Sequence, residues 1–205
     1  MLVPYLATYQ SQSNWVPYGH LICTPVSLLI GTTYLHGRNI DGFSEECVRE
    51  IMSISHALYK ERFAQNGQPL SVHELFQFIN KESFDFMEAA GTVLSSNGEE
   101  VMHGMAAENL VVMSLHELIL ALLESCREMG QRISLIATAN EHTVCYLMEA
   151  NSTLFVFDPL PASMCSLHDI FVSDSELTTW LEQKYGSSTE NLYSALILKN
   201  KHCDS

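Results

Sequence analysis

Three residues of this sequence have side chains that together could perform nucleophilic catalysis: Cys23, His142 and Asp158. Cys23 comes directly before an apolar stretch typical of a buried helix, and the first backbone N–H groups of a helix have no intrahelical acceptor. Those groups and the helix dipole stabilise an anion, so this position favours a thiolate. A neighbouring imidazolium would lower the pKa of the thiol further, which makes Cys23 the candidate nucleophile.

His142 and Asp158 lie on the two arms of an expected β-hairpin. Residues 142–148 are rich in β-branched and aromatic side chains, residues 153–157 alternate, and residues 150–152 form a turn signal between them. A turn at that place sets His142 nearly opposite Asp158, and directly opposed residues have Cβ atoms roughly 4.5–5.5 Å apart. The carboxylate could then accept a hydrogen bond from one imidazole nitrogen and leave the other nitrogen free as a base.

Each of these residues also has an ordinary structural explanation. Cys23 could be a buried structural thiol, His142 a partly exposed residue at a strand start, and Asp158 a turn residue before proline. His20 lies three residues before Cys23, but an extended chain would direct its side chain elsewhere. On the sequence alone these alternatives stay open.

The remaining cysteines and histidines show no metal-binding pattern. The sequence has six cysteines and nine histidines but no CxxC or HxxxH pair, so neither a metal site nor another cofactor is predicted. A chain of this length without a signal peptide is expected to keep its thiols reduced. We expect Cys47 and Cys126 in helices and Cys145 in a strand, as small hydrophobic residues of the core.

The elements that must position these residues follow one order, with helices first and strands later. Thr24 is expected to cap a buried helix from about Pro25 to Leu35, which Gly37 ends. The other expected elements are helices after the caps Ser44, Ser71 and Ser114, a helix over 174–185, and strands over 133–137, 142–148, 153–157 and 193–198. Residues 83–110 show no clear period. This order predicts an α+β fold.

Length and charge bound the class of protein. A chain of 205 residues suits a single domain over residues 1–205, with a mainly helical lobe over 1–130 that carries the nucleophile and a sheet lobe over 131–205 that carries the histidine and aspartate. The net charge of −14 argues against nucleic acid as a partner. No apolar run reaches the roughly 18 residues of a membrane span, and no secretory signal is visible. We therefore expect a cytoplasmic protein, with host cytoplasm or nucleus left open.

The arrangement resembles the plan of the papain-like cysteine peptidases, in which a Cys at the start of a helix faces a His on a sheet and an Asn or Asp on the next strand orients the His. A narrower resemblance is to the deubiquitinase domain of herpesvirus large tegument proteins and to the viral-tegument-like deubiquitinases. The matching pieces are Gln10, Gly19-His20-Leu21-Ile22-Cys23, His142-Thr143-Val144-Cys145 and Phe157-Asp158-Pro159. The resemblance implies a papain-like fold, with a helical N-terminal part packed on a C-terminal antiparallel sheet.

The same resemblance implies roles for the site residues. Cys23 matches the nucleophile, His142 the base and Asp158 the residue that orients the base. Gln10 matches the residue that helps to form the oxyanion hole, and Gln12 is the fallback. The herpesvirus domains place a His two residues after the Asp as the base, where this sequence has Leu160. Either His142 takes that role or the domain is inactive, and we favour the first.

The implied partners are ubiquitin or a ubiquitin-like protein and the proteins that carry it. Ubiquitin ends in Arg-Leu-Arg-Gly-Gly, and an acidic protein suits the two arginines. Two other functions stay open: a papain-like effector that acts as a peptidase, deamidase or acyltransferase on another protein, and a catalytically degenerate module that binds ubiquitin.

Overall fold

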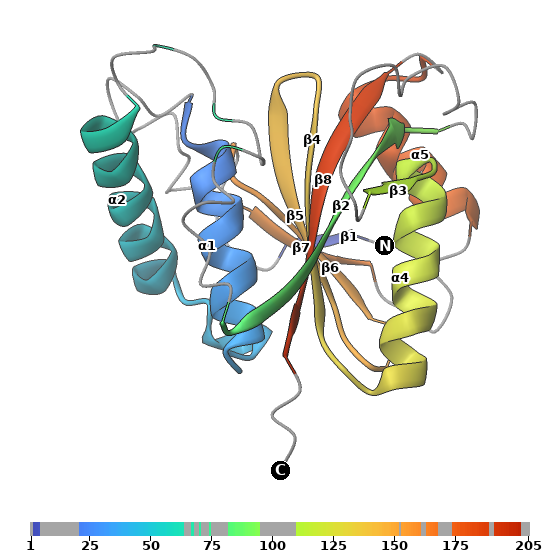
Figure 1. Ribbon diagram of the computed structural model, residues 1–205, viewed down its shortest axis with the longest axis horizontal. Helices are drawn as coiled ribbons and strands as arrows, with labels where there is room; N and C mark the ends of the chain where they lie inside the picture. The colour runs from blue at the N-terminus through green and yellow to red at the C-terminus, as the bar shows by residue number, and fades with distance from the viewer. Residues whose placement is uncertain are drawn as a thin grey trace.

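The computed structural model has one β-sheet with helices packed on both of its faces (Figure 1). It describes residues 2–4, 21–63, 67, 70, 74, 82–94, 110–151, 153–160, 163–167, 174–188 and 191–201. The strands are β1 (Leu2–Pro4), β2 (Phe84–Thr92), β3 (Leu110–Val112), β4 (Ile133–Ala139), β5 (His142–Met148), β6 (Leu154–Asp158), β7 (Ser163–Leu167) and β8 (Leu192–Asn200). The helices are α1 (Cys23–Leu35), α2 (Glu45–Arg62), α4 (Leu115–Met129) and α5 (Asp174–Tyr185), with a 3₁₀ turn over Ile40–Gly42.

The described strands pair in the order β1-β7-β6-β5-β4-β8-β2-β3. Every neighbouring pair of these described strands is antiparallel except β2 and β3, which run parallel. This arrangement confirms the predicted α+β class. Strands β1, β2 and β3 come from residues 1–130 and join the same sheet as the strands of residues 131–205. The two parts therefore differ in their prevailing element type but share one sheet.

The alternation of side chains along each strand builds two cores. On one face, Cys145 and Leu147 of β5 pack with residues of α1 and α2. On the other face, Tyr146 and Met148 pack with residues of α4 and α5. Successive residues of a strand point to opposite faces, so an almost wholly apolar strand such as β5 is explained by helices on both sides.

The helix that carries Cys23 begins earlier than the sequence predicts. Its first residue is Cys23, and the backbone N–H of Val26 donates to the carbonyl of Ile22 at 3.0 Å. Thr24 is therefore not the N-cap, and no described side chain caps this helix. The hydroxyl of Thr24 donates to the carbonyl of Leu70 at 2.5 Å instead. The predicted end of the helix, at Leu35, is confirmed.

Close packing of α1 on the sheet depends on a glycine in the middle of the helix. A Cβ atom on Gly31 would lie 2.3 Å from Oγ of Ser134. We expect Gly31→Ala to lower the free energy of unfolding by about 1–3 kcal/mol, because extra atoms in a packed core force neighbours to shift. Urea denaturation measures this. The double variant with Ser134→Ala should recover part of the loss, and equal stability of Gly31→Ala and the parent chain would contradict the packing.

Most other helix predictions are confirmed where the structure describes them. Ser114 and Glu117 form the predicted capping box, with the backbone N–H of Glu117 donating to Ser114 Oγ at 3.2 Å, and α4 ends before Gly130 in the left-handed region at φ 64°. Ser44 caps α2 as expected. The predicted cap at Ser71 lies outside the described residues.

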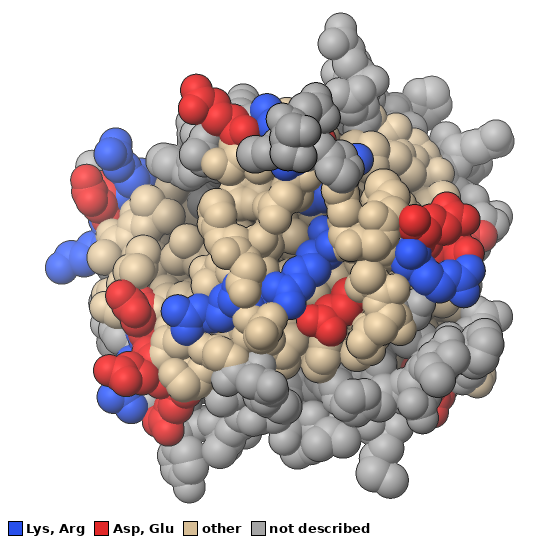
Figure 2. All heavy atoms as spheres, turned by 90° about the horizontal axis from the view of Figure 1, so that it is seen from below, with Lys and Arg blue, Asp and Glu red and all other residues tan. Residues whose placement is uncertain are grey.

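Charged side chains at the end of the molecule shown in Figure 2 are mixed in sign. Acidic and basic groups are interspersed there, as on an ordinary solvated surface. In the described part of the chain, none of the helices is both long enough and apolar enough to cross a bilayer.

Candidate active site

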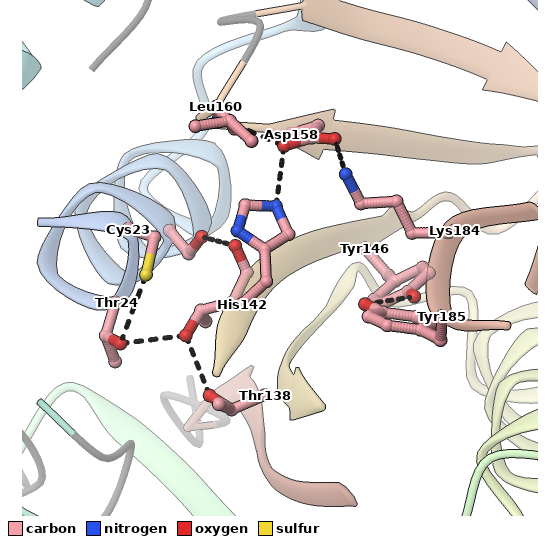
Figure 3. A network of polar contacts seen from close by, with 11 residues as sticks. Cys23, Thr24, Thr138, His142, Tyr146, Asp158, Leu160, Lys184 and Tyr185 are labelled. Atoms are coloured by element: carbon pink, nitrogen blue, oxygen red, sulfur yellow. Dashed lines mark hydrogen bonds and ion pairs between the residues drawn. The ribbon is translucent and has the colours of Figure 1, made fainter. Parts of the chain in front are cut away.

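The site lies at one end of the sheet, where α1 begins and β5 begins. Cys23 is the first residue of α1 and is only 2% exposed. His142 is the first residue of β5, and its ring lies between α1 and the Asp158 carboxylate (Figure 3). The structure thus brings together the three residues that the sequence predicted as nucleophile, base and orienting carboxylate.

The contact between His142 and Asp158 is direct. Nε2 of His142 donates to Oδ1 of Asp158 at 2.8 Å, and both side chains are largely buried. A carboxylate only accepts, so the hydrogen on the neutral ring sits at Nε2 and Nδ1 carries the lone pair. Nδ1 is the nitrogen left to interact with the Cys23 thiol. This is the arrangement that the predicted hairpin required.

The register of that hairpin differs slightly from the prediction. The observed pairs include Cys145 with Phe157 and Met148 with Leu154, so the same register, continued, would place Val144 rather than His142 opposite Asp158. His142 is the diagonal neighbour of Asp158. Diagonal pairs are about 7–8 Å apart at the backbone and stay within reach of long side chains. The predicted hairpin is confirmed, but its two strands pair slightly out of the predicted register.

A tight turn directs His142 toward the site. Asn140 and Glu141, which join β4 to β5, both have positive φ angles of 49° and 60°. Two such residues in a row form the turn type that matches the twist of a hairpin, although Glu in this region is strained. The Asn140 side chain offsets this by donating to the carbonyl of Tyr185 at 2.7 Å. Asn140 is therefore a polar group that supports the turn leading into His142.

Hydroxyl groups tie the start of β5 to the start of α1. Oγ1 of Thr143 lies 2.8 Å from Oγ1 of Thr24 and 2.8 Å from Oγ1 of Thr138. The carbonyl of Leu70 takes the only hydrogen of the Thr24 hydroxyl, so Thr143 donates to Thr24 and Thr138 donates to Thr143. This chain of hydrogen bonds fixes the separation of the two segments that carry the thiol and the imidazole.

The electrostatics of the site favour a thiolate and an imidazolium. Burial raises the pKa of the Cys23 thiol, but the hydrogen bond with His142, the backbone hydrogen bond with Thr143 and the nearby Thr143 hydroxyl outweigh it, so the pKa lies below its usual value. Burial lowers the pKa of His142, but its hydrogen bonds with Asp158 and Cys23 outweigh burial and raise the pKa. The two shifts have opposite directions, as expected for a charged pair.

Cys23 differs in this respect from the other described thiols. All four cysteines whose side chains are described are free. Burial raises the pKa of Cys126 to about 11 and that of Cys145 to about 12, and it also raises the pKa of Cys47. A lowered thiol pKa is typical of a reactive cysteine and a raised one of a structural cysteine. Cys23 is therefore the candidate nucleophile among them.

Two further contacts to Asp158 were not predicted from the sequence. The ammonium group of Lys184, near the end of α5, forms an ion pair with Oδ2 of Asp158. The backbone N–H of Leu160 donates to Oδ1 at 3.0 Å. Burial raises the pKa of Asp158, but the hydrogen bonds from His142 and Lys184 outweigh it and lower the pKa. Nothing in the sequence around Lys184 distinguishes it from an ordinary basic residue in the last turn of a helix.

The remaining site predictions lie outside the described residues. Gln10, its fallback Gln12 and His20 belong to this group. Leu160 is described, and its side chain is 45% exposed. Within the described residues there is no group of three or more His, Cys, Asp or Glu side chains that could hold a metal ion.

Comparison with known proteins shows which fold carries these three residues. No protein-family model matches the sequence, and no curated protein matches it. Among solved structures, the ubiquitin-specific protease encoded by a murine cytomegalovirus tegument protein, in complex with a ubiquitin-based suicide substrate, is similar with a TM-score of 0.58 over 100% of this chain and 88% of that chain. This chain has the papain-like fold.

The sequence identity to that viral protease is 15%, so the likeness concerns the fold and not the site residues. The avirulence protein AvrPphB of Pseudomonas is also similar, with a TM-score of 0.41, 10% identity, and coverage of 94% of this chain and 96% of that chain. The predicted papain-like fold is confirmed, with a helix that begins at Cys23 and a sheet that carries His142 and Asp158.

Proposed function

We propose that this protein is a thiol-dependent cysteine isopeptidase that removes ubiquitin or a ubiquitin-like modifier from other proteins. The observation that carries the proposal is the contact series from Cys23 through His142 to Asp158 in a papain-like fold, with the pKa of the thiol lowered and that of the imidazole raised. A low thiol pKa beside an oriented imidazole is what nucleophilic catalysis by cysteine requires.

The reaction proceeds in two halves. Sγ of Cys23 attacks the carbonyl carbon of the terminal glycine of the modifier, and the carbonyl π electrons move to oxygen. His142, which has taken the thiol proton, gives it to the lysine nitrogen as the C–N bond breaks, and a thioester forms. Water then attacks the thioester, with His142 as its base. The proton returns to sulfur as the C–S bond breaks.

Stabilisation of the oxyanion is assigned to the start of α1. The backbone N–H of Cys23 belongs to the uncapped first turn of that helix, where the dipole also favours negative charge. The side-chain amide of Gln10 is proposed as a second donor, with Gln12 as the fallback. Asp158 keeps the ring of His142 in place through both halves and stabilises the imidazolium.

The choice of substrate rests on three points. Cys23 is 2% exposed, and a thiol this buried suits a Gly-Gly terminus, which has no side chains. The net charge of −14 suits the two arginines of the ubiquitin tail. The viral protease of similar fold is ubiquitin-specific. Because a thiolate nucleophile must stay reduced, we also propose a reducing, intracellular compartment such as the cytoplasm.

Incubation with ubiquitin that carries a C-terminal electrophile, followed by intact mass measurement, tests this function. We expect one added ubiquitin per chain. Parallel probes built on ubiquitin-like proteins and a panel of ordinary peptide amides define the class of substrate. Cleavage of ordinary peptides without any ubiquitin adduct would favour the alternative function, a papain-like effector in which the same residues act on another protein. No reaction with any probe would favour a degenerate binding module.

A further inference from the structure

Lys184 is a charged residue of the site that the mechanism above does not use. Its ammonium group pairs with Oδ2 of Asp158, the oxygen that does not face His142. The Lys184 and Asp158 side chains are 20% and 12% exposed. A partly buried ion pair is screened less by salt than a pair on the surface.

Separate donors hold both oxygens of Asp158. Oδ1 accepts from Nε2 of His142 and from the backbone N–H of Leu160, and Oδ2 accepts from Lys184 (Figure 3). Rotation of the carboxylate would break at least one of these contacts. The orientation of the His142 ring therefore depends on Lys184 as well as on Asp158.

The end of α5 is anchored beside the strand that carries His142. The carbonyl of Tyr185 accepts from Nδ2 of Asn140 at 2.7 Å, and the Tyr185 and Tyr146 hydroxyls lie 3.1 Å apart. Asn140 belongs to the turn that leads into His142. Lys184 thus extends from a fixed backbone, which reduces the conformational entropy lost when its ammonium group is held in one place.

We propose that Lys184 is a positioning residue of this site: its ammonium group holds the Asp158 carboxylate toward His142 and neutralises part of its charge. The inference rests on the proposed roles of His142 and Asp158, but it does not depend on which protein is the substrate. It assigns to α5 a part in catalysis, although the helix supplies no reacting atom.

The effect of the Lys184 charge has a definite sign. The titratable groups that act on His142 are Asp158 on β6, Cys23 on α1 and Lys184 on α5. Burial lowers the pKa of His142, the hydrogen bonds with Asp158 and Cys23 raise it, and the positive charge of Lys184 lowers it. Removing the ammonium group while the carboxylate stays in place should raise this pKa. Releasing the carboxylate from the ring should lower it.

Titration of His142 by NMR tests the charge. The full chain with Cys23→Ala removes the coupled thiol, and the His142 signal is assigned by its loss in His142→Gln. We expect Lys184→Met to shift the titration midpoint to higher pH and Lys184→Arg to leave it near that of the Cys23→Ala chain. An unchanged midpoint would overturn the proposal, whereas a shift to lower pH would overturn the charge role and retain the positioning role, because it reports release of the carboxylate from the ring.

The rate of the intact site tests the positioning. In the chain with Cys23, Lys184→Met should slow formation of the ubiquitin adduct at the optimum pH roughly 10- to 100-fold, because a displaced base costs that much. Lys199→Met removes the same charge at the far end of β8, where Lys199 pairs with Ile133, and should change neither readout. An unchanged rate in Lys184→Met would overturn the positioning role. If Lys184→Met shifts the titration midpoint but the parent chain with Cys23 forms no ubiquitin adduct, the proposed substrate is rejected and the role of Lys184 is retained.

Discussion

Replacing Cys23 with alanine is expected to abolish both turnover and adduct formation. Without the thiol the chain has no atom placed to form the thioester, and His142 with the helix N–H groups can at most assist direct attack by water. We expect kcat/KM to fall by about 10³-fold or more, in line with the loss of a nucleophile from other catalytic triads. Release of a fluorophore from a ubiquitin C-terminal amide, followed as initial rates near pH 7, measures the loss.

Two matched variants separate chemistry from packing. Cys23→Ser keeps nearly the same shape but replaces the thiol by a much weaker acid, so it should be as inactive as Cys23→Ala. Cys47→Ala removes a half-buried thiol on α2 whose pKa is raised, and it should keep full activity. Thermal unfolding of all three chains checks the fold. Turnover that survives in Cys23→Ala would refute the assigned nucleophile.

Local patterns in the sequence were enough to predict the three candidate site residues that lie together in the structure. Cys23 stood out because it precedes an apolar helix, and His142 and Asp158 because two strand patterns flank a turn. Each of these signals is short-range, and the structure brings the three side chains together as predicted. The start of α1 was misplaced by two residues because Thr24 is a common helix cap. Its hydroxyl is used in a tertiary contact with Leu70 instead.

The parts that the sequence did not predict depend on long-range contacts. Strand β2 lies in a stretch without a clear period, and nine of its residues pair with β8, which is about a hundred positions away in the chain. The contact of Lys184 with Asp158 joins residues 26 positions apart on different elements. Ion pairs of this kind follow from how α5 packs on the sheet, and the residue types alone do not reveal them.

Loss of His142 is expected to have the second largest effect, because two roles are proposed for this residue. In the proposed mechanism it accepts and returns the proton, and general acid–base catalysis contributes roughly 10²–10⁴-fold to such reactions. It also lowers the pKa of Cys23 through its hydrogen bond and its charge, against the effect of burial. His142→Ala should therefore reduce kcat/KM by about 10³-fold and also raise the thiol pKa from its value in the parent chain.

The pH dependence of Cys23 alkylation tests the second role without any substrate. In the parent chain the thiolate forms below the usual thiol pKa, and the imidazolium persists above the usual histidine pKa, so kcat/KM should rise with the first ionisation and fall with the second. In His142→Ala the rise in alkylation rate should move to higher pH. Leu160 supplies the control, because the sequence resemblance gives its position to the base of the herpesvirus domains. Leu160→Ala should leave the alkylation profile unchanged, whereas an unchanged profile in His142→Ala would mean that His142 is not the partner of the thiol.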